Sequence, residues 1–237
     1  EYYNALANYY IKYLQAYAVN GVSVDNIVLF NESVCDTCPD HGYSSVTYKE
    51  MGEIIKYYLV PQLQANKLTP KIILGETCFR YSGLESFPVV LDDPEAGKYV
   101  NKLAVHGYDW DNFSSLTNLH ERYPDLPIWM TEICYVKLPV FEFSDGEYWG
   151  NMIMNDMKNW VSGWIYWNMI LDQEGGPWLT STEHGGPDNN HQHPVVIIDR
   201  NTKEVTYTGL YYYLAHFSRF VKPGAYRINC TGDTSKL

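Results

Sequence analysis

Five short apolar segments, separated by longer stretches of helical character, constrain the fold of this chain more than any other feature. They are NIVLF (26–30), PKIILGE (70–76), KLAVHGYD (102–109), PIWMTE (127–132) and GWIYWNMI (163–170). Strands that are apolar on both faces and alternate with helices are typical of parallel sheets with right-handed crossover connections. The sequence therefore predicts an α/β protein.

Helical spacing of apolar residues fills the gaps between these strands. The first helix is expected over residues 2–18, with one apolar face made of Tyr3, Leu6, Tyr10, Tyr13, Leu14 and Tyr17. Further helices are expected from Thr47-Tyr-Lys-Glu50, which reads as a capping box, and from Asp93-Pro94-Glu95. Two more are expected over residues 114–123 and from about 147 to 160.

The spacing of the strands favours a barrel over an open sheet. The strands begin near residues 27, 71, 103, 127 and 163, and a (β/α)8 barrel uses about 30 residues per repeat. An open doubly wound sheet is the alternative, but it normally carries a glycine-rich phosphate loop after an early strand, and none is present. A (β/α)8 TIM barrel is therefore predicted, although only five of its eight strands are found.

Chemically unusual residues follow the carboxyl ends of these strands, where barrel enzymes place their active sites. They are Asn31 and Glu32, Glu76, His106 and Tyr108, Glu132, and Trp167 and Asn168. Glu32 and Glu132 come from distant strands and could face each other across one cleft. Glycoside hydrolysis needs such a pair of carboxyl groups, one to protonate the leaving oxygen and one to attack or to activate water.

The composition excludes other classes of function. The net charge of −11 argues against binding to nucleic acid or to anionic lipid, because both need a basic surface. No apolar run approaches the roughly 18 residues of a transmembrane segment. Five cysteines, among them Cys35 and Cys38 in a CxxC, and the sequons at Asn112 and Asn229 favour a secreted or lysosomal glycoprotein.

Several blocks of the chain resemble glycoside hydrolase family 30, the glucosylceramidase-like retaining enzymes. The blocks are FNES, AVHGYDW, IWMTEIC, GWIYWNMILDQEGGPW and TYTGLYYYLAHFSRFVKPGAYRI, in the order in which the family has them. The resemblance runs from about residue 2 to residue 228. It implies a retaining β-glycosidase that works by double displacement without a cofactor or a metal. The implied substrate is either a β-glucoside that resembles glucosylceramide or a β-1,6-glucan.

The resemblance also assigns roles to individual residues. Glu32 would be the general acid/base and Glu132 the nucleophile, while Asn31 would hydrogen-bond the sugar hydroxyl beside the reacting carbon. The other implied substrate-binding residues are His106, Tyr108, Trp167, Asn168 and Trp178. Among these, Trp167 would form an apolar floor under the sugar, which presents a C–H face to the indole.

The resemblance places this chain in the second part of a catalytic barrel, supplying roughly strands 4–8. Residues 1–222 would belong to the barrel, and residues 223–237 would begin the connection to a β-sandwich. Strands 1–3 and the β-sandwich would lie outside this chain. A second chain, or another piece of the same precursor, is therefore expected to complete the barrel, since a half barrel would expose unpaired strand edges.

Alternatives remain open at several points. An inactive carbohydrate-binding or structural protein could keep the same fold, and a barrel enzyme of another class could use one glutamate as a base. The Cys35–Cys38 pair near His41 could form a disulfide, remain reduced or bind metal, and residues 183–193 (EHGGPDNNHQH) could line the site or bind metal. Glu76 could contribute to the site, although a structural role is expected for it, and His216 is predicted to be a buried, hydrogen-bonded core residue.

Overall fold

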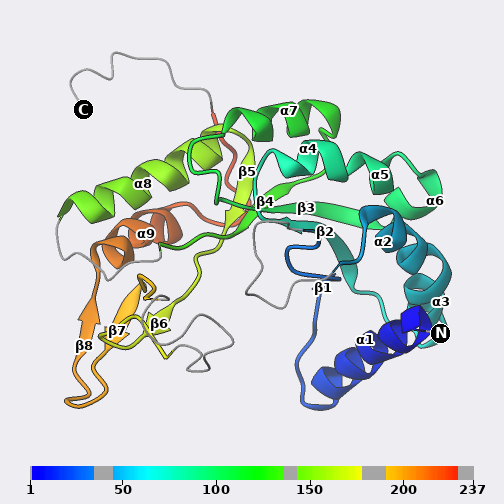
Figure 1. Cartoon of the computed structure of the whole chain (residues 1–237), viewed down its shortest axis with the longest axis horizontal. Coiled ribbons are helices and arrows are strands. Elements are labelled where there is room, and N and C mark those ends of the chain that lie inside the picture. Colours follow the sequence, from blue (N-terminus) through cyan, green and yellow to red (C-terminus); the bar gives the residue numbers. More distant parts are fainter. Residues whose placement is uncertain (1, 35–44, 136–142, 178–190, 229–237) are drawn as a thin grey trace.

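A parallel sheet with helices packed along it forms the centre of the molecule (Figure 1). The computed structural model describes residues 2–34, 45–135, 143–177 and 191–228. The sheet contains β1 (Asn26–Val28), β2 (Lys71–Thr77), β3 (Val100–His106), β4 (Ile128–Glu132) and β5 (Val161–Trp164).

The order of the strands in this sheet follows their order in the chain. β1 to β5 are neighbours in sequence, and each pairs in parallel with the next. A doubly wound sheet reverses its strand order at a switch point, and this sheet does not. The arrangement is that of part of a (β/α)8 barrel, so the predicted fold is confirmed for the strands that the chain contributes.

Helices connect and cover the strands. Their bounds are α1 (Tyr2–Val19), α2 (Tyr48–Ile54), the π-helix η1 (Ile55–Leu59), α3 (Val60–Ala65), α4 (Ser82–Ser86), α5 (Pro88–Leu91), α6 (Pro94–Gly97), α7 (Ser114–Arg122), α8 (Phe143–Lys158) and α9 (Gly209–Phe220). The predicted capping box is confirmed, because Thr47 Oγ1 accepts from Glu50 N while the Glu50 carboxylate accepts from Thr47 N. Asp93 caps α6 as predicted.

The hydrophobic core lies between the sheet and these helices. Ile72 and Leu74 of β2, Leu103 and Val105 of β3, and Met130 of β4 are all buried in it. Burying apolar side chains of this kind stabilises a fold by about 1.5–3 kcal/mol each. The core therefore holds the carboxyl ends of the strands in fixed relative positions.

Three details of the predicted helices are wrong. Tyr13 and Tyr17 of the predicted apolar face are exposed, whereas Leu14 of that face is buried together with Ala7 and Ile11, which the prediction did not include. Helix α8 begins at Phe143, before the predicted position. His216 is exposed on α9 and not in the core, although its Nδ1 does bond to the carbonyl of Tyr212.

A second, smaller sheet was not predicted. It contains β6 (Ile170–Leu171), β7 (Val196–Ile198) and β8 (Val205–Tyr207), with β6 and β7 parallel and β7 and β8 antiparallel. The predicted fifth strand over 163–170 is accordingly divided: β5 ends at Trp164, and β6 begins at Ile170 in the other sheet.

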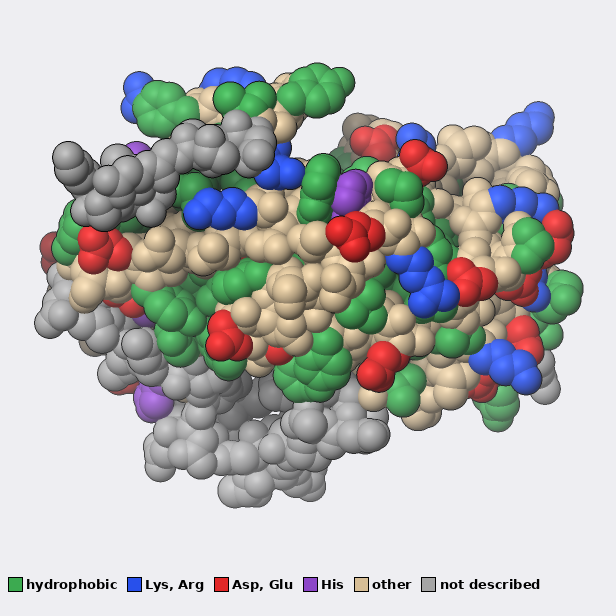
Figure 2. Space-filling view, turned by 90° about the horizontal axis from the view of Figure 1, so that it is seen from above, with side chains coloured by type: hydrophobic (Ala, Val, Ile, Leu, Met, Phe, Trp, Pro, Cys, Tyr) green, Lys and Arg blue, Asp and Glu red, His purple; other side chains and the backbone are tan. Residues whose placement is uncertain are grey.

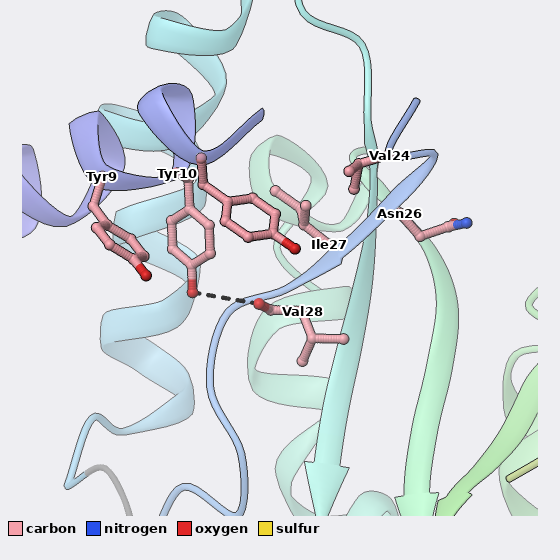
Figure 3. Close-up of a pocket in the computed structure, with 7 residues that line it drawn as sticks. Tyr9, Tyr10, Val24, Asn26, Ile27 and Val28 are labelled. Carbon is pink, nitrogen blue, oxygen red and sulfur yellow. Dashed lines mark hydrogen bonds between the residues drawn. The ribbon is translucent and has the colours of Figure 1, made fainter. Parts of the chain in front are cut away.

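The outer edge of β1 is open within the described part of the chain, since β1 pairs there with β2 alone. A hollow of about 230 Å³ runs along this edge, lined by Tyr9, Tyr10 and Tyr13 of α1 and by residues 24 and 26–28 (Figure 3). The Tyr10 hydroxyl donates to the carbonyl oxygen of Val28 at 3.3 Å. Part of the edge therefore faces a tyrosine-lined hollow.

The surface carries charges of both signs. Acidic and basic side chains are scattered over the face seen in Figure 2 among hydrophobic and uncharged groups. None of the helices in the described ranges has the length and apolar character needed to cross a bilayer.

Residues 223–228 form neither helix nor strand, and 229–237 lie outside the described residues, so the predicted start of a β-sandwich connection at 223 stays a prediction.

Candidate active site

Polar residues at or just after the carboxyl ends of β1, β2, β3 and β4 meet at one end of the sheet. Glu32 is buried, and its backbone N–H donates to the carbonyl oxygen of Glu76 at 2.8 Å. Its φ of 45° places it in the left-handed region, which is uncommon for a residue with a side chain. This turn brings the Glu32 carboxylate toward the neighbouring strands, while the adjacent Asn31 is exposed.

A β-bulge at the end of β2 directs Glu76 into the site. Gly75 pairs with Ala104 and Thr77 with Val105, so Glu76 is an extra residue without a partner in the ladder. Gly75 has a φ of 134°, and a Cβ atom there would lie 2.0 Å from the Ala104 carbonyl oxygen. Only glycine fits at this position, and the bulge re-aims the side chain that follows it.

His106, the last residue of β3, lies at the centre of the site and is fully buried. Its Nδ1 is 2.7 Å from Oε1 of Glu32, and its Nε2 is 2.8 Å from Oε2 of Glu76. The same Nδ1 is 3.8 Å from Oε1 of Glu132. One imidazole ring thus faces three carboxylates that come from three segments of the chain.

Glu132 ends β4 beside a second register shift. Val105 pairs with Met130 and His106 with Glu132, which leaves Thr131 as the extra residue. The Tyr108 hydroxyl donates to Oε1 of Glu132 at 3.0 Å. Both bulges lie at the carboxyl ends of strands, where they turn acidic side chains toward His106.

The two predicted catalytic carboxylates are close to each other. One ligand atom each from Glu32, His106 and Glu132 can be chosen so that all three lie within 4.8 Å of one another. Carboxyl groups in retaining glycosidases are about 5–5.5 Å apart, and those in inverting enzymes are about 6.5–9.5 Å apart. The two carboxylates here each have an oxygen within 4.8 Å of the other, which is closer than the separation in inverting enzymes.

These three groups are also near enough to hold a metal ion, but their contacts fit a proton better. Two ligands of one tetrahedral Zn²⁺ are separated by about 3.3–3.5 Å. His106 Nδ1 and Glu32 Oε1 are only 2.7 Å apart, which is a hydrogen-bond distance. The pair therefore shares a proton in this geometry.

The charges of the site shift the pKa values of its members. Burial alone would lower the pKa of His106, but hydrogen bonds with Glu32 and Glu76 and the nearby charge of Glu132 outweigh it and raise the pKa to about 9. Burial raises the pKa of Glu132, whereas His106 and the Tyr108 hydrogen bond oppose that rise. Burial also raises the pKa of Tyr108, which therefore stays a hydrogen-bond donor.

Aromatic and amide groups extend the site beyond the carboxylates. The Trp167 backbone N–H donates to the carbonyl of Ile133 at 3.1 Å, so Trp167 lies beside the segment that follows Glu132. Trp167 is 47% exposed, so it is not enclosed in the core. Asn168 is half-buried, and its amide donates to the side chain of Gln192. Trp178 lies outside the described residues.

The sequence analysis underestimated one feature of the site and missed another. Glu76 was expected to be structural, yet it bonds directly to His106. Arg80 was not considered at all, although its buried guanidinium donates to the carbonyl of Gly107, between the site residues His106 and Tyr108. Gly75 could have signalled the position of Glu76, because a glycine inside a strand often marks a bulge.

The other predicted metal and disulfide positions have mixed outcomes. Cys35, Cys38 and His41 lie outside the described residues, as do residues 183–190. His193, at the end of the histidine-rich segment, is buried and bonds through Nε2 to Asp145 Oδ2 at 2.7 Å. Cys134 is a buried free thiol, and Cys78 is also buried.

Comparison with known proteins identifies a family with the same architecture. The family model described as the glycosyl hydrolase family 30 TIM-barrel domain matches residues 1–221. A Caenorhabditis elegans protein described as a candidate glucosylceramidase is 31% identical over 96% of this chain and 44% of its own length. An endo-1,6-β-D-glucanase of Neurospora crassa is 28% identical over 98% of this chain and 46% of its own length.

A solved structure agrees with these relatives. An endo-β1,6-glucanase superposes with a TM-score of 0.80 and 27% sequence identity, over 94% of this chain and 48% of its own. The chain therefore spans just under half the length of each of these proteins.

Proposed function

The chain belongs to glycosyl hydrolase family 30, and from this premise we propose that it carries both catalytic glutamates of a retaining β-glycoside hydrolase. The observation that carries the proposal is the approach of a Glu32 oxygen to a Glu132 oxygen within 4.8 Å, which is closer than the carboxyl groups of inverting enzymes. The half-exposed Trp167, whose backbone bonds to Ile133 next to Glu132, offers a flat apolar surface for a sugar ring.

The proposed reaction has two steps. In the first, Glu132 attacks the anomeric carbon while Glu32 donates a proton to the leaving oxygen, which takes the electron pair of the broken C–O bond. In the second, Glu32 removes a proton from water, and the water oxygen displaces Glu132 from the sugar. Asn31, His106, Tyr108, Trp167, Asn168 and Trp178 form the proposed substrate-binding set.

The names of the relatives support a narrower substrate class. They include glucosylceramidases and endo-1,6-β-glucanases, so we propose a β-glucoside, either glucosylceramide-like or a β-1,6-glucan. An inactive carbohydrate-binding protein with this fold is the alternative that the experiment below must exclude.

Completion of the barrel by further strands is part of the proposal. A (β/α)8 barrel needs eight strands, and the central sheet of the described residues has five. The open edge of β1 and the tyrosine-lined hollow beside it support attachment of another strand there (Figure 3). Another chain or another segment of the same protein would supply it.

Replacing each glutamate tests the assignment of roles. In the intact protein, Glu132→Gln should abolish turnover of every β-glucoside, because the nucleophile is lost. Glu32→Gln should abolish turnover of substrates with poor leaving groups but spare aryl glycosides whose leaving group needs no proton. Retention of sugar binding by a wild-type protein that hydrolyses none of these substrates would favour the binding alternative.

A further inference from the structure

Glu76 contacts the predicted acid/base in two separate ways. Its carbonyl oxygen accepts the backbone N–H of Glu32 at 2.8 Å, which helps to set the strained turn of that residue. Its carboxylate Oε2 lies 2.8 Å from Nε2 of His106, whose Nδ1 lies 2.7 Å from Glu32 Oε1. A continuous chain of hydrogen bonds thus runs from Glu76 through the imidazole ring to Glu32.

The number of protons in this chain follows from its chemistry. An ionised carboxylate can only accept hydrogen bonds, and a neutral imidazole has one donor and one acceptor nitrogen. Both ring nitrogens of His106 face a carboxylate oxygen at hydrogen-bond distance. The Glu76–His106–Glu32 chain must therefore hold one proton more than a neutral histidine between two carboxylates.

We propose, on the basis of the function proposed above, that Glu76 is a positioning residue whose carboxylate holds the Nε2 proton of His106 and so keeps the Nδ1 proton directed at Glu32. When the leaving oxygen takes a proton from Glu32, Glu32 passes on the single extra proton of this chain, which it takes from Nδ1. His106 then becomes neutral with its remaining proton on Nε2, bonded to Glu76. When Glu32 deprotonates water in the second step, it can return a proton to Nδ1.

The groups around His106 favour this arrangement. The titratable residues that face the ring are Glu32 after β1, Glu76 in β2, Tyr108 after β3 and Glu132 in β4. Tyr108 stays neutral, so the imidazolium faces three carboxylates and no other positive charge among them. The pKa of His106, raised to about 9, agrees with a ring that keeps both protons at neutral pH.

The backbone is shaped for this contact. Because Glu76 is the extra residue of the bulge, its side chain can leave the alternation of β2 and turn toward His106. A carboxylate that fixes the tautomer and orientation of a histidine is a familiar device in hydrolytic sites. Here the oriented histidine would act on a carboxyl group, whereas a serine hydroxyl is its usual target.

The ¹⁵N resonances of the His106 imidazole test this proposal independently of catalysis. We compare the intact wild-type protein with Glu76→Gln and with Glu121→Gln, which removes the same charge from an exposed position on α7. Both ring nitrogens of the wild type should stay protonated through neutral pH. In Glu76→Gln the ring should lose a proton about 1–3 pH units lower, because a close opposite charge is gone.

The same variants have a kinetic signature. Glu76→Gln should slow substrates with poor leaving groups about tenfold more than activated aryl glycosides. General acid catalysis contributes about 10²–10⁴-fold to the rate, and the expected tenfold loss is a part of that contribution. Glu121→Gln should change neither class. The NMR titration of His106 does not depend on turnover. Its result can therefore be interpreted even in a protein that hydrolyses none of the tested glycosides.

Two results would overturn the proposal. One is a His106 ring that titrates in Glu76→Gln as it does in the wild type; the other is an equal loss of rate for all substrates. If Glu76→Gln does not fold, as judged by circular dichroism, Glu76→Asp replaces it in both experiments. Aspartate keeps the charge but reaches one methylene less far, so the His106 titration should again move down, and an unchanged titration would contradict the proposal.

Discussion

Replacing Asp156 by Asn is expected to lower the free energy of unfolding by about 3 kcal/mol. Arg80 Nε lies 2.9 Å from Asp156 Oδ1 and Nη2 lies 3.1 Å from Oδ2, and both side chains are fully buried. Breaking one partner of a buried ion pair costs about 3–5 kcal/mol, because the other charge stays buried without compensation. We take the lower end, since Asp109 still contacts Arg80 at 2.8 Å.

Urea denaturation of the intact protein measures this loss, and a thermal scan should show a decrease of about 6–12 °C in Tm. Asp92→Asn is the matched control. Its partner Arg122 is 2.7 Å away, but the two side chains are 55% and 46% exposed, so the expected loss is below about 1 kcal/mol. A loss for Asp156→Asn no larger than that for Asp92→Asn would refute the reasoning.

Two further predictions concern the site itself. Tyr108→Phe removes a hydrogen bond to ionised Glu132, so the already raised pKa of Glu132 should rise further. Since the nucleophile must be ionised, activity is lost as pH falls through that pKa, and the acidic limb of kcat/KM should move up by about one pH unit; a downward or absent shift would contradict this. Gly75→Ala places a methyl group against the Ala104 carbonyl at a positive φ, which should destabilise the protein by about 1–3 kcal/mol or more and displace Glu76. An unchanged urea midpoint together with unchanged His106 resonances would show that the bulge tolerates a side chain.

Much of the fold could be predicted because its signals are local. The capping box at Thr47 and Glu50 is complete within four residues, and the structure forms it as the sequence indicates. The apolar runs of β2, β3 and β4 likewise indicate buried strands, whichever strands are their neighbours. The meeting of Glu32 and Glu132 followed from one rule, that the carboxyl ends of parallel strands share one edge of the sheet.

The remaining features depend on contacts between distant segments. Whether Glu76 faces the site is decided by a bulge against Ala104, on another strand. The small sheet requires Ile170 to pair with Val196, and strands this short leave little periodic signal.

Burial depth was the other limit of the sequence analysis. Helical spacing identifies the apolar face of a helix, but it does not say how much of that face another element covers. Tyr17 lies on the apolar face predicted for the first helix, and His216 was expected in the core, yet both are exposed. In α1 the smaller Ala7 and Ile11 make the close contacts instead.

The central claim, that Glu132 forms a covalent bond to the sugar, is tested most directly by trapping that bond. The intact protein is incubated with a 2-deoxy-2-fluoro-β-glucoside that carries an activated leaving group, and its peptides are then analysed by mass spectrometry. The account predicts one fluoroglucosyl group on the peptide that contains Glu132, and no label in Glu132→Gln. A label on Glu32 or Glu76, or hydrolysis that inverts the anomeric configuration, would contradict it.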